Sequence, residues 1–261
     1  MTTGPLAAAA ADFRRHGHCV VRALATRPEV EAIRPAIEAA AARRTAGVAP
    51  LSERDTYGRA FLQAANLWRL DDAIAAFVCD PRFARTAAAL MGVDAVRLYH
   101  DQALIKEAGG GPTPWHQDQR YWPLDTTDTI TMWMPLADVS EEIGSMTFAS
   151  GSHRLGDAGV PGISEESEAR LAEVVRRRGL KECTHGALAA GDATFHAGWT
   201  LHRAGANATG ASRPVMTIIY YADGARVAEP ADDYQRFDLA VWLKGSAPGE
   251  RADGPRNPRL E

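Results

Sequence analysis

The hydrophobic pattern of this chain changes its period near Val93, and this change limits the folds that the chain can adopt. Before Val93, apolar residues such as Val30, Ile33 and Ile37 recur at helical spacing. The segment 97–106 alternates instead, as a strand does, and predicts one face made of Leu98, His100, Gln102, Leu104 and Lys106. Further short strands are predicted at 129–135, 145–148, 193–196 and 215–221.

Short strands broken by Gly and Pro turns, behind a helical layer, predict a mainly β protein with flanking helices. The expected core is a double-stranded β-helix, the jelly-roll or cupin-like architecture, with an N-terminal helical layer on one outer face. We expect a single domain over residues 1–261, made of a mainly helical layer (1–92), a jelly-roll core (93–224) and a C-terminal extension (225–261). Helical patterns are also predicted at 61–78 and 82–91, and for a helix capped by Ser164. The tail after Gly245, rich in Pro, Gly and charge, is expected to be loose.

Charge and cysteine usage narrow the classes of partner. The formal net charge is -4 at pH 7, so the chain lacks the basic surplus that nucleic acid or anionic membranes attract. No apolar run approaches the ~20 residues of a membrane span, and no signal peptide is recognisable. The three cysteines are far apart and form no paired motif, which favours reduced thiols and a cytoplasmic location. We therefore expect a small-molecule partner, with no nucleic acid and no membrane.

The segment Trp115-His116-Gln117-Asp118 is the first candidate for chemistry. In an extended segment His116 and Asp118 project to the same side, while Gln117 points away. An imidazole and a carboxylate in this arrangement are two thirds of a facial triad, which leaves coordination positions of Fe(II) open. By itself the motif could also be polar decoration of a strand or loop.

Downstream residues can complete such a site. His202 follows a predicted strand and turn and is the best candidate for a third ligand, with His196 as its rival. Arg213, just before the strand that opens with Pro214, could clamp the distal carboxylate of a dicarboxylic keto acid, or could form an ordinary surface ion pair. Arg203, next to His202, is expected to alternate away from the metal.

These motifs together resemble the phytanoyl-CoA dioxygenase family of Fe(II)/2-oxoglutarate-dependent oxygenases, over about residues 13–221. The resemblance rests on Trp115 to Asp118 with Tyr121 after them, on Glu141 to Met146 leading to Gly151-Ser152-His153, and on His202 with Gly205, Asn207 and Arg213. It implies Fe(II), 2-oxoglutarate and dioxygen as cofactor and co-substrates, and oxidation of a substrate, by hydroxylation or a related reaction, with decarboxylation of 2-oxoglutarate to succinate.

The resemblance also implies roles for individual residues. Iron would be held by His116, Asp118 and His202, and the distal carboxylate of 2-oxoglutarate by Arg213. Trp133 and Gln102 would line the co-substrate pocket, and Trp122, with Tyr121, would face the substrate. Two positions depart from the family pattern: Ile143 replaces a polar residue, and Ala204 replaces a hydroxyl that often helps to hold 2-oxoglutarate.

Two other classes of function remain open. Two histidines and an aspartate would also suit catalytic zinc in a hydrolase, although a hydrolase has no particular need for Arg213 and Trp133. A catalytically silent jelly-roll binding protein is the other alternative. Tyr121 and Trp122 suggest an aromatic wall, and no basic cluster accompanies the metal motif. A small free metabolite is therefore expected as the substrate, in preference to an acyl-CoA.

Overall fold

The computed structural model of the protein describes residues 4–160 and 162–261. Its helices are α1 (Pro5–His16), α2 (Arg27–Thr45), α3 (Thr56–Ala60), α4 (Asp72–Val78), α5 (Pro81–Met91), α6 (Glu165–Arg177) and α7 (Asp233–Val241). Its strands are β1 (His18–Val21), β2 (Leu62–Ala65), β3 (Val96–Lys106), β4 (Thr113–His116), β5 (Thr129–Pro135), β6 (Met146–Ala149), β7 (Glu182–Cys183), β8 (Ala193–Ala197), β9 (His202–Ala204), β10 (Arg213–Ala222) and β11 (Arg259–Leu260).

The strands form two antiparallel sheets that share a core. The major sheet has the order β1-β8-β5-β10-β3-β11, with β2 also paired to β3, and the minor sheet has the order β4-β9-β6-β7. Trp133 of β5, Phe148 of β6 and Val215 of β10 pack in one buried cluster, so the two sheets face each other. This arrangement confirms the predicted jelly-roll core.

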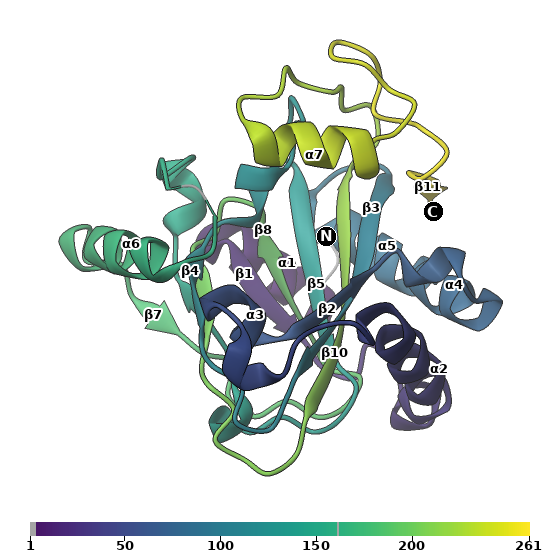
Figure 1. Cartoon of the computed structure of the whole chain (residues 1–261). Coiled ribbons are helices and arrows are strands. Elements are labelled where there is room, and N and C mark those ends of the chain that lie inside the picture. The colour runs from purple at the N-terminus through teal and green to yellow at the C-terminus, as the bar shows by residue number, and fades with distance from the viewer. Residues whose placement is uncertain (1–3, 161) are drawn as a thin grey trace.

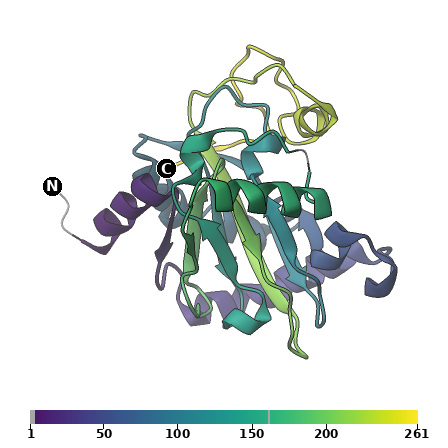
Figure 2. The same ribbon diagram turned by 90° about the vertical axis from the view of Figure 1, so that its left-hand side faces the viewer.

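Helices cover both outer sides of this core. In Figure 1, α2, α4 and α5 lie to the right of the major sheet and α6 lies to the left. Ile37, Ile74 and Phe83 from these right-hand helices join Met132 and Ile218 of the sheet in the largest buried cluster. Figure 2, turned by 90°, shows α6 crossing in front of the strands and α7 at the top. The predicted N-terminal helical layer is therefore present.

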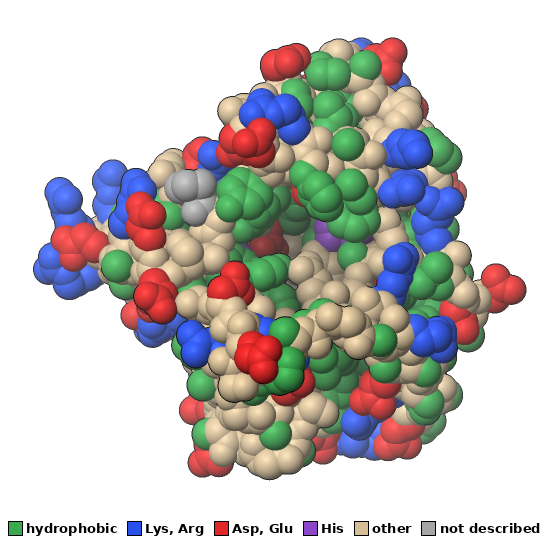
Figure 3. All heavy atoms as spheres, viewed as in Figure 1, with side chains coloured by type: hydrophobic (Ala, Val, Ile, Leu, Met, Phe, Trp, Pro, Cys, Tyr) green, Lys and Arg blue, Asp and Glu red, His purple; other side chains and the backbone are tan. Residues whose placement is uncertain are grey.

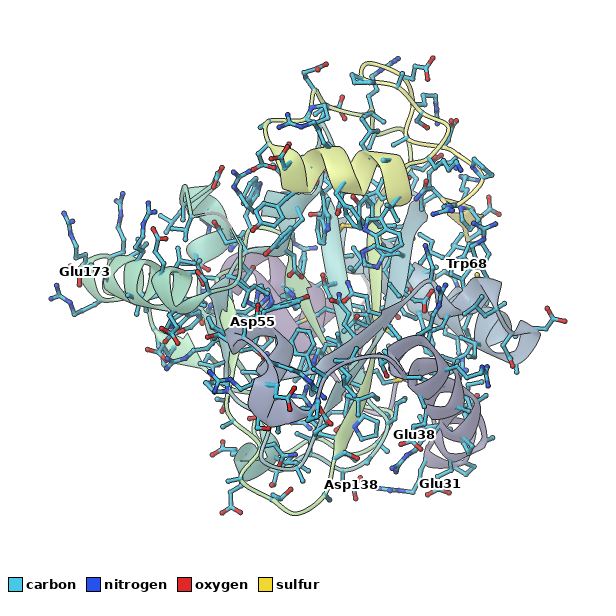
Figure 4. All side chains as sticks on the ribbon, in the orientation of Figure 1. Glu31, Glu38, Asp55, Trp68, Asp138 and Glu173 are labelled. Carbon is cyan, nitrogen blue, oxygen red and sulfur yellow. The ribbon has the colours of Figure 1, made fainter. Side chains whose placement is uncertain are left out.

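Local signals in the sequence set the ends of these helices. Thr26 forms a capping box with Glu29 at the start of α2, and Ser164 caps α6 as predicted. The first residue of α2, Arg27, lies 2.6 Å from Asp138 and 4.0 Å from Glu31. Both acids are labelled in Figure 4, below the sheet. The pair with Asp138 attaches α2 to the loop that follows β5, whereas the pair with Glu31 lies within α2.

The predicted helical stretch at 61–78 is wrong over its first half. Residues Leu62–Ala65 form β2, which pairs with β3, and Asn66 then adopts a left-handed backbone with φ 54°. Only Asp72–Val78 is α-helical, and the Asp71 side chain caps its start. The free edge of β3 supplies backbone partners for β2, and this tertiary pairing overrides the helical preference of the sequence.

The expectation of a loose C-terminal tail is also wrong. Asn257 is fully buried, and its side-chain amide donates hydrogen bonds to the carbonyls of Leu98 (3.0 Å) and Tyr99 (3.3 Å). Just beyond it, Arg259–Leu260 form β11 on the edge of β3. The tail therefore completes the major sheet and satisfies backbone groups that the β3 edge would otherwise leave without partners.

Strand β3 contains a bulge that the alternating pattern did not reveal. His100 pairs with Ile219 and Leu98 pairs with Tyr220, so Tyr99 is an extra residue in β3. As a result Leu98 packs on the helical side with Ala103, whereas the alternation placed it with His100. The bulge turns Tyr99 toward Trp122 instead, where the ring centroids lie 5.5 Å apart.

No helix among the described residues is both long and apolar enough to cross a membrane. All three cysteines are free, and Cys19 is buried while Cys79 and Cys183 are partly exposed. Burial raises the pKa of Cys19 to about 12, so its thiol stays protonated at neutral pH.

Candidate metal and 2-oxoglutarate site

Strand pairing in the minor sheet brings His116, Asp118 and His202 together. β4 pairs with β9 so that His116 and His202 are direct partners, with ring centroids 4.0 Å apart. Asp118 begins a short 3-10 helix immediately after β4, and its Oδ1 lies 3.6 Å from the Nε2 atom of each histidine. The three potential ligand atoms all lie within 4.8 Å of one another.

The hydrogen bonds of both histidines favour the tautomer that a metal needs. The Nδ1 atom of His116 lies 2.8 Å from the Pro114 carbonyl, and that of His202 lies 2.9 Å from the Thr200 carbonyl. Because a carbonyl can only accept, each Nδ1 carries the hydrogen and each Nε2 keeps a free lone pair. Burial lowers the pKa of His116, and burial together with His116 and His196 holds the pKa of His202 well below 6.5. Both imidazoles are therefore neutral at pH 7, and this donor set fits a divalent metal ion.

The two oxygens of Asp118 have different surroundings. Oδ1 faces the two histidines, whereas Oδ2 accepts a hydrogen bond from Thr131 (2.8 Å) and lies 3.0 Å from His196 Nε2. Burial alone would raise the pKa of Asp118, but His202, His196 and His116 together hold it well below its ordinary value. The carboxylate is therefore ionised and held in one orientation. His196 contacts the Oδ2 atom of Asp118 and is not one of the three residues whose ligand atoms cluster together. Gln117 points away from the cluster, as expected, and donates to the carbonyls of Gly156 and Trp199.

Arg213 lies at the start of β10 as a buried guanidinium without a carboxylate. It is 2% exposed, its Nη1 donates to the Gly144 carbonyl, and its Nε has no partner. Its guanidinium carbon lies 5.1 Å from the centre of the Trp133 ring. Among the described residues, no carboxylate oxygen lies within 4 Å of it. Burial lowers the pKa of Arg213 to about 9, so the group still carries its charge at pH 7. A buried cation with an unpaired donor fits the carboxylate of a bound keto acid.

The sequence did not single out Lys106, which pairs with Arg213 across β3 and β10. Lys106 is fully buried and its Nζ donates to the Gly111 carbonyl. Burial, with the charge of Arg213, lowers the pKa of Lys106 to about 7. Gly144 touches both side chains: its carbonyl accepts from Arg213, and a Cβ on it would lie 3.0 Å from the Lys106 side chain. Its φ is +88°, and the same Cβ would lie 2.6 Å from the Gly205 carbonyl. This region therefore concentrates positive charge at one end of the site.

The metal cluster and Arg213 open into the same cavity, which has a volume of about 600 Å³. Its outer walls are aromatic and are supplied by Tyr57, Phe61, Tyr121, Trp122, Tyr234, Phe237 and Trp242. Figure 3 shows the cavity as a central hollow rimmed by hydrophobic side chains, with histidine visible inside it. The carboxylate of Asp55, labelled in Figure 4 beside α3, also lines it.

The structure places the other predicted residues in this cavity with different exposures. Gln102 is partly exposed and accepts a hydrogen bond from Gln63, and Trp133 is buried beneath Arg213. Tyr121 contacts Tyr234 of α7, with ring centroids 5.5 Å apart. Trp122 is only 4% exposed, so most of this ring belongs to the core.

The wall that α7 contributes to the cavity was not predicted from the sequence. Tyr234 and Phe237 are 48% and 58% exposed and stand at the mouth of the cavity, although large apolar side chains usually avoid water. A signal was present: Asp232 is a good N-cap, and Tyr234, Phe237 and Val241 follow helical spacing. Thr131, which orients Asp118, carried no comparable signal.

A two-sheet core that holds two histidines, one carboxylate and a buried arginine is typical of iron- and 2-oxoglutarate-dependent oxygenases. A family model described as phytanoyl-CoA dioxygenase (PhyH) matches residues 13–215. The chain belongs to this family, and the predicted class, with iron and 2-oxoglutarate as cofactors, is confirmed.

Individual relatives differ in what they do. A probable alpha-ketoglutarate-dependent hypophosphite dioxygenase of Stutzerimonas stutzeri is 29% identical over 136 residues, which cover 50% of this chain and 46% of the relative. The match therefore spans about half the length of this curated relative. Among solved structures, the epimerase SnoN from nogalamycin biosynthesis, in complex with Fe3+, alpha-ketoglutarate and nogalamycin RO, is 28% identical, covers 98% of both chains and has a TM-score of 0.78. The carbocyclase SnoK from the same biosynthesis is 26% identical, covers 97% of this chain and 96% of its own, and also has a TM-score of 0.78.

Proposed function

We propose that this protein uses Fe(II), 2-oxoglutarate and dioxygen to oxidise a small molecule, with hydroxylation as the outcome, while 2-oxoglutarate is converted to succinate and carbon dioxide. One observation carries the proposal. The three ligand atoms of His116, Asp118 and His202 converge in the same cavity as Arg213, a buried cation that pairs with no carboxylate in residues 4–160 and 162–261.

In this proposal each residue has a defined task. His116 Nε2, Asp118 Oδ1 and His202 Nε2 hold the metal, and Arg213 binds the distal carboxylate of 2-oxoglutarate. Trp133 packs against the guanidinium, and Gln102 lines the same cavity. When bound, iron supplies the activation of dioxygen that no side chain can perform. The protein's own contribution is to keep both imidazoles neutral, to hold the carboxylate in one orientation and to exclude water.

The lining of the cavity supports a substrate with a ring or another extended apolar surface. Tyr121, Tyr234 and Phe237 offer aromatic surface at the mouth, and a ligand that covered them would remove this apolar area from water. The related SnoN structure holds nogalamycin RO in addition to Fe3+ and alpha-ketoglutarate, so a relative with this fold binds a further molecule beside its cofactors. We propose that Tyr121 contacts the substrate directly and that Trp122 does so through its exposed edge.

The relatives also favour a second outcome at the same site. SnoN is an epimerase and SnoK a carbocyclase, and both resemble this chain over nearly its whole length. Hydroxylation adds an oxygen atom to the product, whereas epimerisation leaves the mass unchanged and ring closure removes two hydrogens. The mass of the product from a candidate substrate therefore distinguishes the three reactions.

The test of the proposed function begins without dioxygen. Protein with Fe(II) and 2-oxoglutarate should show a weak visible charge-transfer band, because the keto acid chelates a reducible metal. Zn(II) has a filled d shell and should give no band. Admitting dioxygen should then release succinate, even slowly and without substrate. If wild-type protein shows neither band nor succinate but hydrolyses an ester or amide with Zn(II) bound, the zinc hydrolase alternative is correct. If it shows no activity of either kind, the proposed function is wrong.

A further inference from the structure

A second groove lies next to the substrate cavity and is lined by three arginines from distant parts of the chain. Arg44 comes from the last turn of α2, Arg69 from the 3-10 helix Leu67–Arg69, and Arg256 from the C-terminal tail. The groove has a volume of about 600 Å³. Trp68, labelled at the right of Figure 4, marks the position of the 3-10 helix. Figure 3 shows Lys and Arg side chains gathered to the right of the central hollow.

The groove adjoins the substrate cavity. Gln63 and Trp242 line both hollows. Gln63 donates to Gln102 inside the cavity, and Trp242 packs against His100, with ring centroids 4.7 Å apart. A ligand that extends past these two side chains would therefore lie partly in each hollow.

The positive charge in this groove is not neutralised by the protein. Among the described residues, no carboxylate lies within 4 Å of Arg44, Arg69 or Arg256, and no acidic residue lines the groove. Elsewhere on the molecule arginines are commonly paired, for example Arg54 with Glu107 and Arg97 with Asp223. Like charges in one hollow repel each other, and an anion bound between them would remove this cost.

Stabilisation of helix ends accounts for only part of this arrangement. Arg44 is favourable at the C-terminus of α2, and Arg256 donates through Nη1 to the carbonyl of Val241, the last residue of α7. These contacts leave the remaining guanidinium donors free. They also give no reason for Arg69 to share the same hollow or for acidic residues to be absent from it.

We propose that this groove binds an oxyanion, a phosphate or carboxylate group, and that the group belongs to the substrate whose reacting part lies in the cavity. The same chemistry could come from a separate small anion. The assignment to the substrate rests on the proposed function, whereas binding of an oxyanion does not.

Titration calorimetry with inorganic pyrophosphate tests the anion site directly. The Arg44→Gln/Arg69→Gln double variant should weaken binding by about tenfold or more, since two charge-assisted contacts are lost. The control, Arg85→Gln/Arg177→Gln, removes the same charge from two exposed positions outside the groove and should bind as wild type does. Thermal unfolding verifies that both variants are folded. Absence of pyrophosphate binding, or equal weakening in both double variants, overturns the proposal.

A second comparison identifies the source of the anion. Phenyl phosphate should bind more tightly than inorganic phosphate, because its ring can contact Trp242, and Trp242→Ala should abolish that advantage. If phenyl phosphate has no advantage in wild type, the ligand is a separate anion and the assignment to the substrate is wrong. These measurements need neither iron nor turnover. Failure to produce succinate would therefore refute the proposed function while leaving the pyrophosphate result intact.

Discussion

Replacing Arg213 with alanine should strongly weaken the binding of 2-oxoglutarate. The pKa of this guanidinium falls from 12.5 to about 9 on burial, and at about 1.4 kcal/mol per pKa unit this corresponds to a charge destabilised by on the order of 5 kcal/mol. A bound carboxylate offsets part of that cost in the wild type. In the variant the carboxylate would lose its forked partner, and Lys106, whose pKa of about 7 leaves it partly charged, would remain nearby.

The expected loss is about 2–5 kcal/mol, because truncating one member of a buried charge pair leaves the other uncompensated. This corresponds to an increase of about thirtyfold to several thousandfold in the dissociation constant. Arg213→Lys should lie between alanine and wild type, since it retains a charge but loses the forked geometry. Anaerobic titration calorimetry with Fe(II)-loaded protein measures all three constants.

Arg203→Ala is the matched control. Arg203 is already paired with Glu168 (3.1 Å) and Glu182 (2.8 Å), so its removal should leave the affinity for 2-oxoglutarate nearly unchanged. 2-Oxoglutarate should also raise the thermal unfolding temperature of wild type and of this control, but not of Arg213→Ala. Equal dissociation constants for wild type and Arg213→Ala would refute the reasoning.

Three further predictions concern the metal, the turn beside Arg213 and the tail. Elemental analysis should show that His202→Ala loses bound iron and that His196→Gln keeps it, because only His202 belongs to the cluster of ligand atoms. Retention of iron by the His202 variant would contradict this prediction. Gly144→Ala should raise the dissociation constant of 2-oxoglutarate. A Cβ at φ +88° meets the Gly205 carbonyl and would displace the Gly144 carbonyl, which accepts from the Arg213 guanidinium. An unchanged dissociation constant by calorimetry would count against this prediction. Asn257→Ala should lower the free energy of unfolding in urea by about 1–3 kcal/mol, because the buried carbonyls of Leu98 and Tyr99 lose their donor. An unchanged free energy of unfolding would mean that the tail is dispensable for stability.

The sequence by itself determined the features that depend on near neighbours in the chain. The two-residue spacing of His116 and Asp118 places both side chains on one side of the same segment, and the capping residues Thr26 and Ser164 fix where α2 and α6 begin. The alternation in 97–106 was sufficient to identify β3 as a strand. These signals are local, because backbone geometry alone relates the residues involved.

Only the tertiary structure decided which distant residues meet. The sequence left His196 and His202 as rivals, and the pairing of β4 with β9 places His202 directly opposite His116, while His196 contacts the far oxygen of Asp118. The bulge at Tyr99 has no signature in a pattern of period two, because it depends on the register with β10.

The same reason explains the errors at 61–78 and in the tail. Both segments pair with the same edge of β3, where hydrogen bonds to a strand far away in sequence outweigh local preference. The groove formed by Arg44, Arg69 and Arg256 is the clearest case in which folding decides which distant residues meet. The sequence has no basic cluster near the metal motif, yet folding brings these three charges from opposite ends of the chain to one hollow beside the cavity. Spacing along a chain reports neighbours within a few residues, whereas a binding site is defined by neighbours in space.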